Sequence, residues 1–465
     1  MISPAPQTDP TQIPGKPARN IWTAGTLVYT TTGLVVLFAW LLWGDFAWAM
    51  KDRAIPPIMQ LLLKKFGASD MVAGLLFGTL PPAIGLILGP IISYKSDRHR
   101  GRWGRRIPFL LIPTPIAVLA IIGLAFSPNI GAFADKLLGS HSFGLNPCVL
   151  IFLGLFWMLF EFATVTANSV YIALINDVVP RPVLGRFFGL FRALSLIAGI
   201  IFNWWIIKKA ETGYVWIFVG MGVLYGIGFT IMCLKVKEGE YPPQPPMDAG
   251  RDVRGFIPAM KSYFQECFGN SYYWWFFGAM AVAGVATGPV NLYSIFFMTS
   301  VHMDLGMYGK CLTLTYVISL VMAYPLGWLA DRIHPLRLGI GVLMLYAMVT
   351  LWGGLFARDA QTFAIALVAH GVVAGIWGTA TASLSQRLLP KAEFAQFSSA
   401  AGIIGSLSWM MLAPVAGFFL DHVHHDYRFT FFMGFGLAIL GLMGCLVLHG
   451  KFMALGGPDG YVAPE

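Results

Sequence analysis

Five arginines and one aspartate are packed into the segment from Ser96 to Arg106, between two long runs of apolar residues. A charged side chain at the centre of a bilayer costs about 3 kcal/mol or more. The segment therefore predicts a short loop at a membrane surface, with a spanning helix on either side. Because lysine and arginine are enriched in cytoplasmic loops, the same segment predicts that this surface is the cytoplasmic one.

The composition extends this prediction to the whole chain. Hydrophobic residues make up 57% of it and charged residues only 11%, whereas a soluble domain carries about 25% charged residues. The net charge of +9 lies mostly in short loops, which indicates a membrane surface rather than a nucleic acid as partner. The sequence has no glycine-rich phosphate loop, no metal-type cysteine spacing and no paired catalytic grouping, so it predicts neither an enzyme nor a bound cofactor.

Spans can be predicted from apolar length, since a helix needs about 20 residues to cross a bilayer core of about 30 Å. That length predicts twelve spans, six on either side of the polar segment 235–271. The first set is expected near 33–63, 71–94, 107–126, 147–176, 187–207 and 214–234, and the second near 272–299, 307–330, 336–357, 360–388, 395–420 and 428–449. Most lysines and arginines face the cytoplasm if both termini do, so we expect a multi-pass protein of the cell (inner) membrane with cytoplasmic termini.

The spans divide the chain into five parts. Residues 1–26 are polar and proline-rich, without the pattern of a signal peptide, and predict a disordered cytoplasmic tail. Six-helix bundles are expected over 27–234 and 272–450. Prolines in 235–271 forbid a span and favour an extended cytoplasmic linker, and 451–465 is expected to be a cytoplasmic C-terminal tail.

Matching charged motifs end corresponding spans in the two sets. Spans 2 and 8 both end in an aspartate–arginine pair, and spans 4 and 10 both run into polar turns, which suggests two related halves. Acid and base at a helix end can cap the helix and bridge to a neighbour, which favours a breakable cytoplasmic gate. Ordinary helix ends with an excess of topogenic charge are the alternative. The predicted gate residues are Asp97, Arg98, Arg102, Arg105, Arg106, Asp177, Arg186, Asp331 and Arg332.

The arginine-rich loop also resembles a known signature. The form from Ser96 to Phe109 is similar to the loop G-x-x-x-D-R-x-G-R-R of the major facilitator superfamily, although Gly89 lies further upstream and two residues are added. It looks closer to the branch of sucrose–proton symporters and glycoside–pentoside–hexuronide:cation symporters. In span 1, Asp45-Phe46-Ala47 looks like the D-F-A of melibiose carriers. The resemblance implies an all-α membrane protein of twelve helices in two pseudo-symmetric six-helix bundles, with a central cavity that opens alternately to either side.

Acids at mid-depth are the candidates for proton coupling. Glu161 lies near the centre of span 4 among apolar residues that disfavour its charged form, so it suits a group that gains and loses a proton. A permanently protonated or paired structural glutamate is the alternative, and sucrose carriers have an acid at about this place. Asp45 is the second candidate if span 1 runs to about residue 63; Asp52 then lies on the same helical face, with Arg53 beside it. A first span that ends at Met50, with a wet boundary after it, is the alternative.

Further polar and aromatic residues within the spans are candidates for contact with a cargo. Asn168 shares the helical face of Glu161, and Asn291 and His370 are single polar residues in spans 7 and 10 that also suit hydrogen bonding between helices. Aromatic rings suit stacking on a sugar or, alternatively, helix packing. The candidate substrate-binding residues are Asp45, Asp52, Arg53, Asn168, Asn291, His370, Trp48, Trp377 and Tyr293.

Two differences from the carriers that this chain resembles bear on the coupling ion and on the proton relay. Melibiose carriers hold sodium with two aspartates on span 2, where this chain has Gly85 and Gly89, so the sodium site is absent. Sucrose carriers have an arginine late in span 4 where this chain has Ile172, and Arg53 is a candidate substitute. The histidine-rich run 421–426 is interpreted as a solvated outer loop rather than a metal site.

These observations predict a monomeric secondary transporter that moves a sugar-like solute with a proton by alternating access. The alternatives are a transporter of a non-sugar metabolite, by uniport or antiport, and a sensor that has lost transport.

Overall fold

The computed structural model describes residues 21–241, 265–390 and 394–464, and within these ranges the fold is almost entirely helical. Two short strands, β1 (Trp22–Ala24) and β2 (Leu27–Tyr29), pair as an antiparallel hairpin before the first helix. Gly25 forms its turn with a φ of 57°, a left-handed conformation that favours glycine. Regular structure therefore begins inside the segment 1–26 that was predicted as a tail; residues 1–20 lie outside the described residues.

The helices fall into two sets on either side of the connection 235–271. The first set consists of α1 (Thr31–Lys65), α2 (Asp70–Gly74), α3 (Leu80–Arg98), α4 (Ile107–Leu111), α5 (Pro113–Leu138), α6 (Leu145–Val178), α7 (Arg181–Ile201) and α8 (Ala210–Lys235). The second consists of α10 (Ser271–Val285), α11 (Gly288–Ser300), α12 (Leu305–Ile333), α13 (Pro335–Phe356), α14 (Ala360–Ala380), α15 (Leu384–Leu388), α16 (Phe394–His422), α17 (Arg428–Ala454) and α18 (Gly457–Gly460). Short π-helical turns connect α2 to α3 (Leu75–Thr79) and follow α7 (Phe202–Ile206), and 3₁₀ turns follow α5 (Gly139–His141) and precede α8 (Ile207–Lys209).

Eleven continuous helical stretches of the described residues are long and apolar enough to cross a membrane. The longest, Arg181–Lys235, has 55 residues and holds two helices, α7 and α8. Both pack against α1, so the chain reverses between them. The described residues therefore contain twelve helical segments long and apolar enough to be the spans that apolar length predicts, and the all-α prediction is confirmed.

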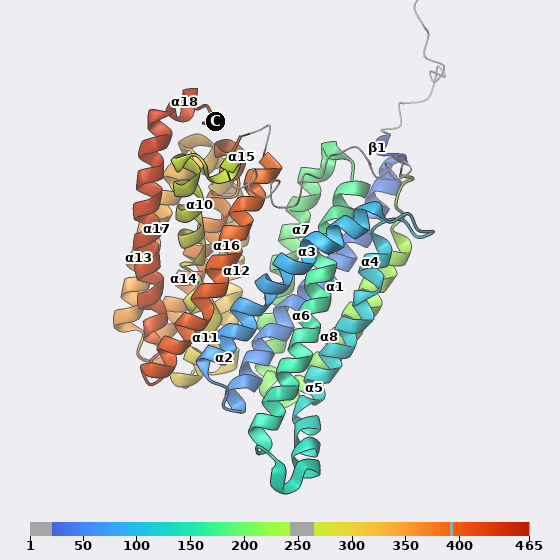
Figure 1. The fold of residues 1–465 in the computed structure, drawn as a ribbon, viewed down its shortest axis with the longest axis vertical. Coiled ribbons are helices and arrows are strands. Elements are labelled where there is room, and N and C mark those ends of the chain that lie inside the picture. Colours follow the sequence, from blue (N-terminus) through green and yellow to red (C-terminus); the bar gives the residue numbers. More distant parts are fainter. Residues whose placement is uncertain (1–20, 242–264, 391–393, 465) are drawn as a thin grey trace, which may run out of the picture.

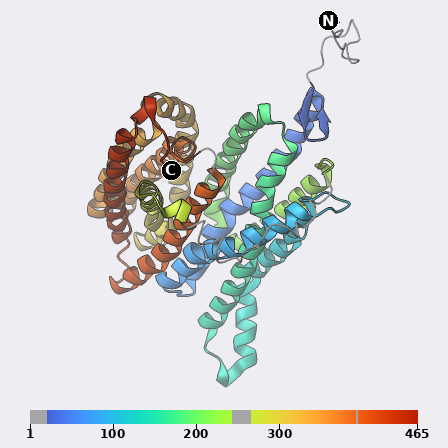
Figure 2. The ribbon, with the colours of Figure 1, turned by 45° about the horizontal axis from the view of Figure 1, so that its top comes forward.

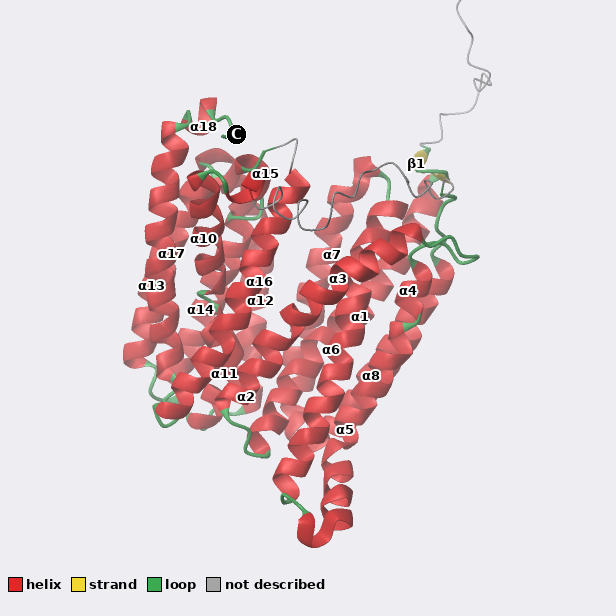
Figure 3. Cartoon of the chain, in the orientation of Figure 1, coloured by secondary structure: helices red, strands yellow, loops and turns green. Residues whose placement is uncertain are grey.

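The two sets form two bundles that lie side by side (Figure 1). Within the first, α5 packs on α6 and α1 on α8; within the second, α17 packs on α13 and α10. The view in Figure 2 keeps the bundles separate, and helices account for nearly all of the described residues in Figure 3. The hairpin and the C-terminal end lie at the same end of the molecule, which we call the termini side; the other end is the opposite side (Figure 1).

Small residues let the two bundles approach closely where α2 and the turn after it meet α16. α2 and the π turn after it pack against α16, α1 packs against α11, and α7 packs against α12. A Cβ atom added at Gly78 would collide with Ala413, and one at Gly417 would collide with the carbonyl oxygen of Asp70. Such close backbone contact between helices requires residues without side chains. Figure 1 shows the bundles converging at α2 and α11, toward the opposite side.

α1 is a single helix of 35 residues that includes Lys51, Asp52 and Arg53. The longer of the two first spans considered from the sequence is therefore present in the structure. The C-terminal segment, predicted as a tail over 451–465, is docked on the second bundle. The Tyr461 hydroxyl donates to the carbonyl of Leu388 (2.7 Å), and the Tyr273 hydroxyl donates to that of Pro464 (2.6 Å).

Candidate functional site: a charged cluster at mid-span and two polar clusters at the ends

Three residues of α1 form a polar strip about halfway along that helix. Asp45 is 2% exposed, and its Oδ2 atom has no hydrogen-bond partner among the described residues. Lys51 is completely buried, whereas the side chain of its neighbour Asp52 is 45% exposed. The Nζ atom of Lys51 lies 2.7 Å from Oδ1 of Asp52, so the two form an ion pair with one buried and one open member.

The ammonium group of Lys51 is enclosed by aromatic rings as well as by oxygen atoms. It lies 4.0 Å from the ring centre of Trp48, 4.9 Å from that of Phe160 and 5.2 Å from that of Tyr225. It also donates to the hydroxyl of Thr164 on α6 (3.2 Å). A buried lysine is stable only where such cation–π contacts and an anionic partner replace water.

Glu161 lies on α6, three residues before Thr164, and is 9% exposed. The charges of Lys51 and Asp52 both act on its carboxyl group. The charge of Asp52 also acts on the carboxyl group of Asp45. Both acids predicted for proton coupling thus belong to one electrostatic group with a single enclosed cation. We call Asp45, Lys51, Asp52 and Glu161 the mid-span cluster.

Arg53 reaches from α1 into the second bundle. Its Nη1 donates to the hydroxyl of Tyr316 on α12 (2.9 Å), and its Nη2 to that of Ser195 on α7 (3.4 Å). The guanidinium carbon lies 4.8 Å from the ring centre of Tyr316. Arg53 therefore joins the two bundles next to the mid-span cluster.

The remaining predicted cargo contacts are spread over several places. In the second bundle, Nε2 of His370 lies 3.0 Å from Oδ1 of Asn291, and its Nδ1 lies 2.9 Å from the hydroxyl of Tyr346. The amide oxygen can only accept, so Nε2 carries the proton and Nδ1 accepts from Tyr346. Asn168 is exposed on α6. In the hydrogen-bonded series Tyr346–His370–Asn291 the histidine is buried, so it is the exposed Asn291 that is open to solvent or to a ligand.

The three predicted aromatic residues pack within the protein. Trp48 stacks on Tyr171 (ring centres 6.1 Å apart) in the first bundle. Trp377 borders Gly339 in the second bundle. Tyr293 is buried between the bundles, where its hydroxyl donates to the carbonyl oxygens of Asp70 (3.0 Å) and Ala413 (3.2 Å). In this conformation these rings serve helix packing.

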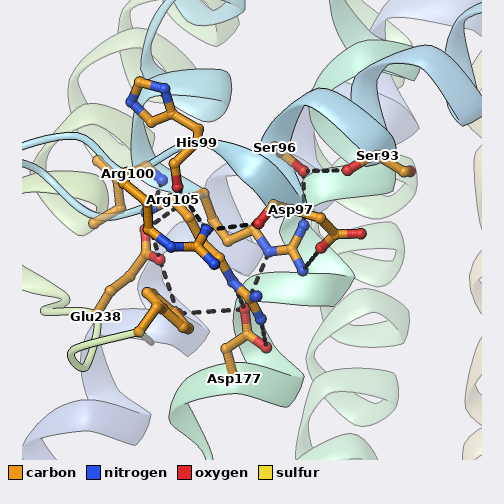
Figure 4. A network of polar contacts seen from close by, with 11 residues as sticks. Ser93, Ser96, Asp97, His99, Arg100, Arg105, Asp177 and Glu238 are labelled. Carbon is orange, nitrogen blue, oxygen red and sulfur yellow. Dashed lines mark hydrogen bonds and ion pairs between the residues drawn. The ribbon is translucent and has the colours of Figure 1, made fainter. Parts of the chain in front are cut away.

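Predicted gate residues come together on the termini side (Figure 4). The guanidinium of Arg105 binds Asp177 through two hydrogen bonds, 2.8 and 3.1 Å long, and Nε of Arg106 donates to Oδ2 of the same carboxylate (3.0 Å). Arg106 also pairs with Asp97 and donates to the hydroxyl of Ser96 (2.6 Å). The loop after α3 is thereby tied to the end of α6.

Two further members of this group were missed from the sequence. The Glu238 carboxylate accepts hydrogen bonds from the backbone N–H groups of Arg105 (3.0 Å), Arg106 (2.8 Å) and Ile107 (2.8 Å). The hydroxyl of Tyr241 donates to Glu238 (2.9 Å), and its ring lies 4.0 Å from the guanidinium of Arg105. In the sequence, Glu238 is distinguished only by its position directly after a span, where it follows Lys237 and precedes a second acid, Glu240.

We call Asp97, Arg105, Arg106, Asp177, Glu238 and Tyr241 the termini-side cluster. All six belong to the first bundle or to the first residues after it. Burial opposes the charge of Arg105, but the hydrogen bond and the charge of Asp177 outweigh it and raise the pKa of the guanidinium. Burial and the neighbouring carboxylates of Glu238 and Asp177 raise the pKa of Tyr241, which therefore stays a donor.

The other predicted gate residues lie elsewhere. Arg102 and Arg186 are exposed, and Arg332 stacks on Trp328 (5.3 Å) at the end of α12 in the second bundle. Arg98 ends α3. The side chain of Asp331 lies outside the described residues. The contacts described for Asp97, Arg105, Arg106 and Asp177 thus stay within one bundle and its following segment.

On the opposite side, a second polar group joins the two bundles. Both carboxylate oxygens of Asp421 on α16 accept from backbone N–H groups at the start of α2, those of Asp70 (2.8 Å) and Met71 (3.0 Å). The fully buried carboxylate of Asp70 lies 2.7 Å from Nδ1 of His425 and accepts from the hydroxyl of Tyr427 (2.9 Å). That hydroxyl in turn lies 2.7 Å from Nζ of Lys64 on α1. We call Lys64, Asp70, Asp421, His425 and Tyr427 the opposite-side clamp.

The clamp contains a set of metal-type ligands. One ligand atom each of Asp70, Asp421 and His425 lies within 4.8 Å of the others. Yet both carboxylates already accept hydrogen bonds from protein groups. The cluster is therefore satisfied by its own donors, and the arrangement acts as a bridge between α2 and α16.

Comparisons with known proteins agree with this architecture. The sequence model of the Major Facilitator Superfamily matches residues 21–413 and 276–452. A 104-residue segment, 22% of this chain, is 32% identical to the proton-associated sugar transporter A of Homo sapiens. A segment of 141 residues, 30% of the chain, is 28% identical to the sucrose transport protein SUT1 of Oryza sativa subsp. japonica. The matched segments span only 13% and 25% of these two relatives.

Solved structures share the fold. A bacterial homologue of the human lysosomal transporter Spinster, in an inward-facing and unoccupied conformation, matches with a TM-score of 0.66 and 13% identity over 94% of this chain and 100% of that one. The nucleoside transporter NupG matches with a TM-score of 0.64 and 11% identity over 89% of this chain and 99% of that one. At these identities the likeness concerns the arrangement of helices alone.

Proposed function

Because the chain belongs to the major facilitator superfamily, a family of secondary transporters rather than enzymes, we propose that it moves a sugar-like solute across the membrane together with a proton. The solute class is a mono- or disaccharide or a glycoside. Transport proceeds by alternating access, in which the two bundles rock about a site at mid-depth. The observation that carries the proposal is the mid-span cluster, in which Asp52 and Glu161 interact with one enclosed lysine and Asp45 interacts with Asp52.

Proton coupling is supported by the unequal exposure within the mid-span cluster. Glu161 is nearly enclosed, whereas the side chain of Asp52 is 45% exposed. The cluster has three acids and one cation, so full ionisation would leave it with a net charge of −2 while two of its acids, Asp45 and Glu161, are buried. Binding a proton lowers that cost, and releasing it restores the pairing. Glu161 is the proposed proton carrier, with Asp45 as its partner acid.

The sugar-like cargo is supported by chemistry and by the relatives. The open carboxylate of Asp52, the guanidinium of Arg53 and the exposed amide of Asn168 are groups that bind hydroxyls. Two matched relatives bear the names sucrose transport protein and proton-associated sugar transporter. A second candidate is a non-sugar metabolite, because the family fold is shared with a nucleoside transporter.

The orientation follows from the positive charge of the termini side. We assign this side, with its arginine-rich loop, to the cytoplasm. The opposite-side clamp then faces outward and is closed in the conformation described. Opening it while the termini side closes completes the cycle.

The proposal is tested with purified protein in proteoliposomes. Uptake of radiolabelled sucrose, maltose, glucose, melibiose, uridine and a dipeptide is measured with and without an imposed inward proton gradient. Gradient-stimulated uptake of one of the sugars is the expected result. Uptake confined to uridine or the dipeptide would overturn the sugar assignment, and sugar uptake indifferent to the gradient in both parent and Glu161→Gln would overturn proton coupling.

A further inference from the structure

Lys51 is an unusual residue for the middle of an apolar helix. Its side chain is completely buried, and its one ion pair within 4.0 Å among the described residues is with Asp52. Its other neighbours are the Thr164 hydroxyl and three aromatic rings. An ammonium group has three donors, and among the described residues two oxygen atoms, those of Asp52 and Thr164, accept from this one. One donor is therefore left for a further acceptor.

The alternative partner is close by. Thr164 and Glu161 are three residues apart on α6, and side chains at this spacing lie about 5–6 Å from each other on one helical face. Lys51 already contacts Thr164, so a movement of a few ångströms along α6 brings its ammonium group to the Glu161 carboxyl. Asp52, the present partner, is the member open to a ligand.

We propose that Lys51 is a positioning residue of the transport site, a movable internal cation shared by Asp52 and Glu161. In the conformation described it pairs with Asp52. While cargo hydroxyls bind the open carboxylate of Asp52 and the ammonium group paired with it, Glu161 keeps its proton; when the cargo leaves, the ammonium group turns to Glu161, which then releases its proton. This exchange links occupation of the site by cargo to the proton on Glu161, and in this respect the inference rests on the proposed function.

Other charged and titratable groups around Lys51 do not offer the same exchange. The charge that acts on Asp45 is that of Asp52, whereas that of Lys51 acts on Glu161, and the guanidinium of Arg53 is engaged with Tyr316 and Ser195. Tyr225 on α8 presents its ring to the ammonium group. Among the described neighbours, Asp52 and Glu161 are thus the two acids between which the cation can move.

The inference can be tested without any cargo. The infrared C=O band of protonated carboxyl groups is recorded on the purified full-length protein over a range of pH, and the component absent from Glu161→Gln reports Glu161. In Lys51→Met the pH midpoint of this component is expected to rise by about one unit or more, because the cation that favours the carboxylate is gone. In Asp52→Asn it is expected to fall, because Lys51 is released to Glu161.

A double variant separates movement from simple addition of charges. If Lys51 changes partners, the effect of Asp52→Asn is much smaller in the Lys51→Met background than in the parent; equal effects in both backgrounds would overturn the inference. Lys65→Met, on the same helix but exposed, is the matched control and leaves the midpoint unchanged. Lys51→Arg keeps the charge and stays close to the parent.

Two further outcomes are decisive. If Lys51→Met does not fold, Lys51→Gln takes its place in the same double-variant comparison, and an unchanged midpoint in Asp52→Asn contradicts the inference in either case. The infrared measurement uses no cargo. The midpoint shifts can therefore be absent while gradient-driven sugar uptake is observed, and they can be present while sugar uptake is absent. Failure of the inference and failure of the proposed function are therefore distinguishable.

Discussion

The two ends of the molecule are both held by charged side chains, but in different ways. The opposite-side clamp connects α2 of the first bundle to α16 of the second through Asp70 and Asp421. The termini-side cluster connects helices of the first bundle to one another through Asp177 and Glu238. One set of contacts must break for the bundles to rock, and the other keeps a single bundle rigid while they do. Similar charge density at two ends therefore does not imply similar function.

The largest expected effect comes from breaking the clamp. Asp70→Ala removes the buried acceptor of His425 and Tyr427, and we expect it to destabilise the closed opposite side by about 3 kcal/mol, roughly a hundredfold in the ratio of the two states. Pulsed electron–electron double resonance measures the distance between two spin labels on the opposite side, one at Ser140 in the first bundle and one at Arg358 in the second. Both residues are exposed. A distance distribution identical to the parent would show that Asp70 does not hold the bundles together.

Breaking the termini-side cluster should have a different result. Asp177→Asn weakens the bidentate bond to Arg105 and the bond to Arg106, with an expected loss of about 2 kcal/mol in the stability of the first bundle. The thermal unfolding temperature should fall, while the spin-label distance across the opposite side stays that of the parent. A change in that distance would instead make the cluster part of the link between bundles.

A smaller, pH-dependent effect is expected at the termini side of the second bundle. There α13 is capped by His334, whose Nδ1 accepts from the N–H of Leu336 (3.3 Å). Burial and the nearby positive charges of Arg387, Arg337 and His449 lower the pKa of His334 to about 4. The unfolded chain, with its histidine near 6.5, then binds more protons than the folded one between these values, so stability falls as the pH drops from about 6.5 to about 4.

The size of this effect is about 1 kcal/mol, since the charges of Arg337 and Arg387 are on exposed side chains that solvent screens. Thermal unfolding at pH 7 and pH 4.5 measures it. His334→Asn is the comparison, because asparagine tolerates the φ of 84° and keeps a capping oxygen without a titrating group. The variant should show the weaker dependence on pH; a dependence equal to that of the parent would assign the titration to another residue.

The smallest effect is expected close to the clamp but outside it. Asp426 pairs with Arg428 (2.6 Å), and both side chains are about one-third exposed, at 30% and 34%. The hydrogen bond from Arg428 lowers the pKa of Asp426. Asp426→Asn should cost at most about 0.5 kcal/mol, since solvent screens such a pair. A loss as large as that of Asp70→Ala would mean that charge in this loop, rather than the bridge between bundles, sets the stability of the closed side.

Apolar length was sufficient to predict the helical architecture, since only helices satisfy their backbone groups within a membrane. The prediction extended to the reversal within Arg181–Lys235, where one continuous helical stretch contains two spans. It also grouped Asp97, Arg105, Arg106 and Asp177, because charges excluded from the bilayer collect at helix ends. The sequence analysis did not predict which group each charged side chain pairs with.

Three-dimensional pairing explains what the sequence analysis missed. Glu238 looked like part of a linker, and only the fold brings it to the N–H groups after Gly104. Asp70 and Asp421 are 351 positions apart and carry no local pattern that links them. Lys51 was not singled out as a site residue, because its aromatic cage comes from three different helices. Such contacts depend on packing between elements, which a single sequence does not encode locally.

The account depends most on Glu161 as the proton carrier. With a cargo identified by the uptake panel, a pH-sensitive dye outside proteoliposomes reports whether adding that cargo draws protons inward. We predict cargo-induced alkalinisation outside the vesicles for the parent, and none for Glu161→Gln, although the variant still exchanges labelled for unlabelled cargo. Equal proton uptake by the two proteins would contradict the account.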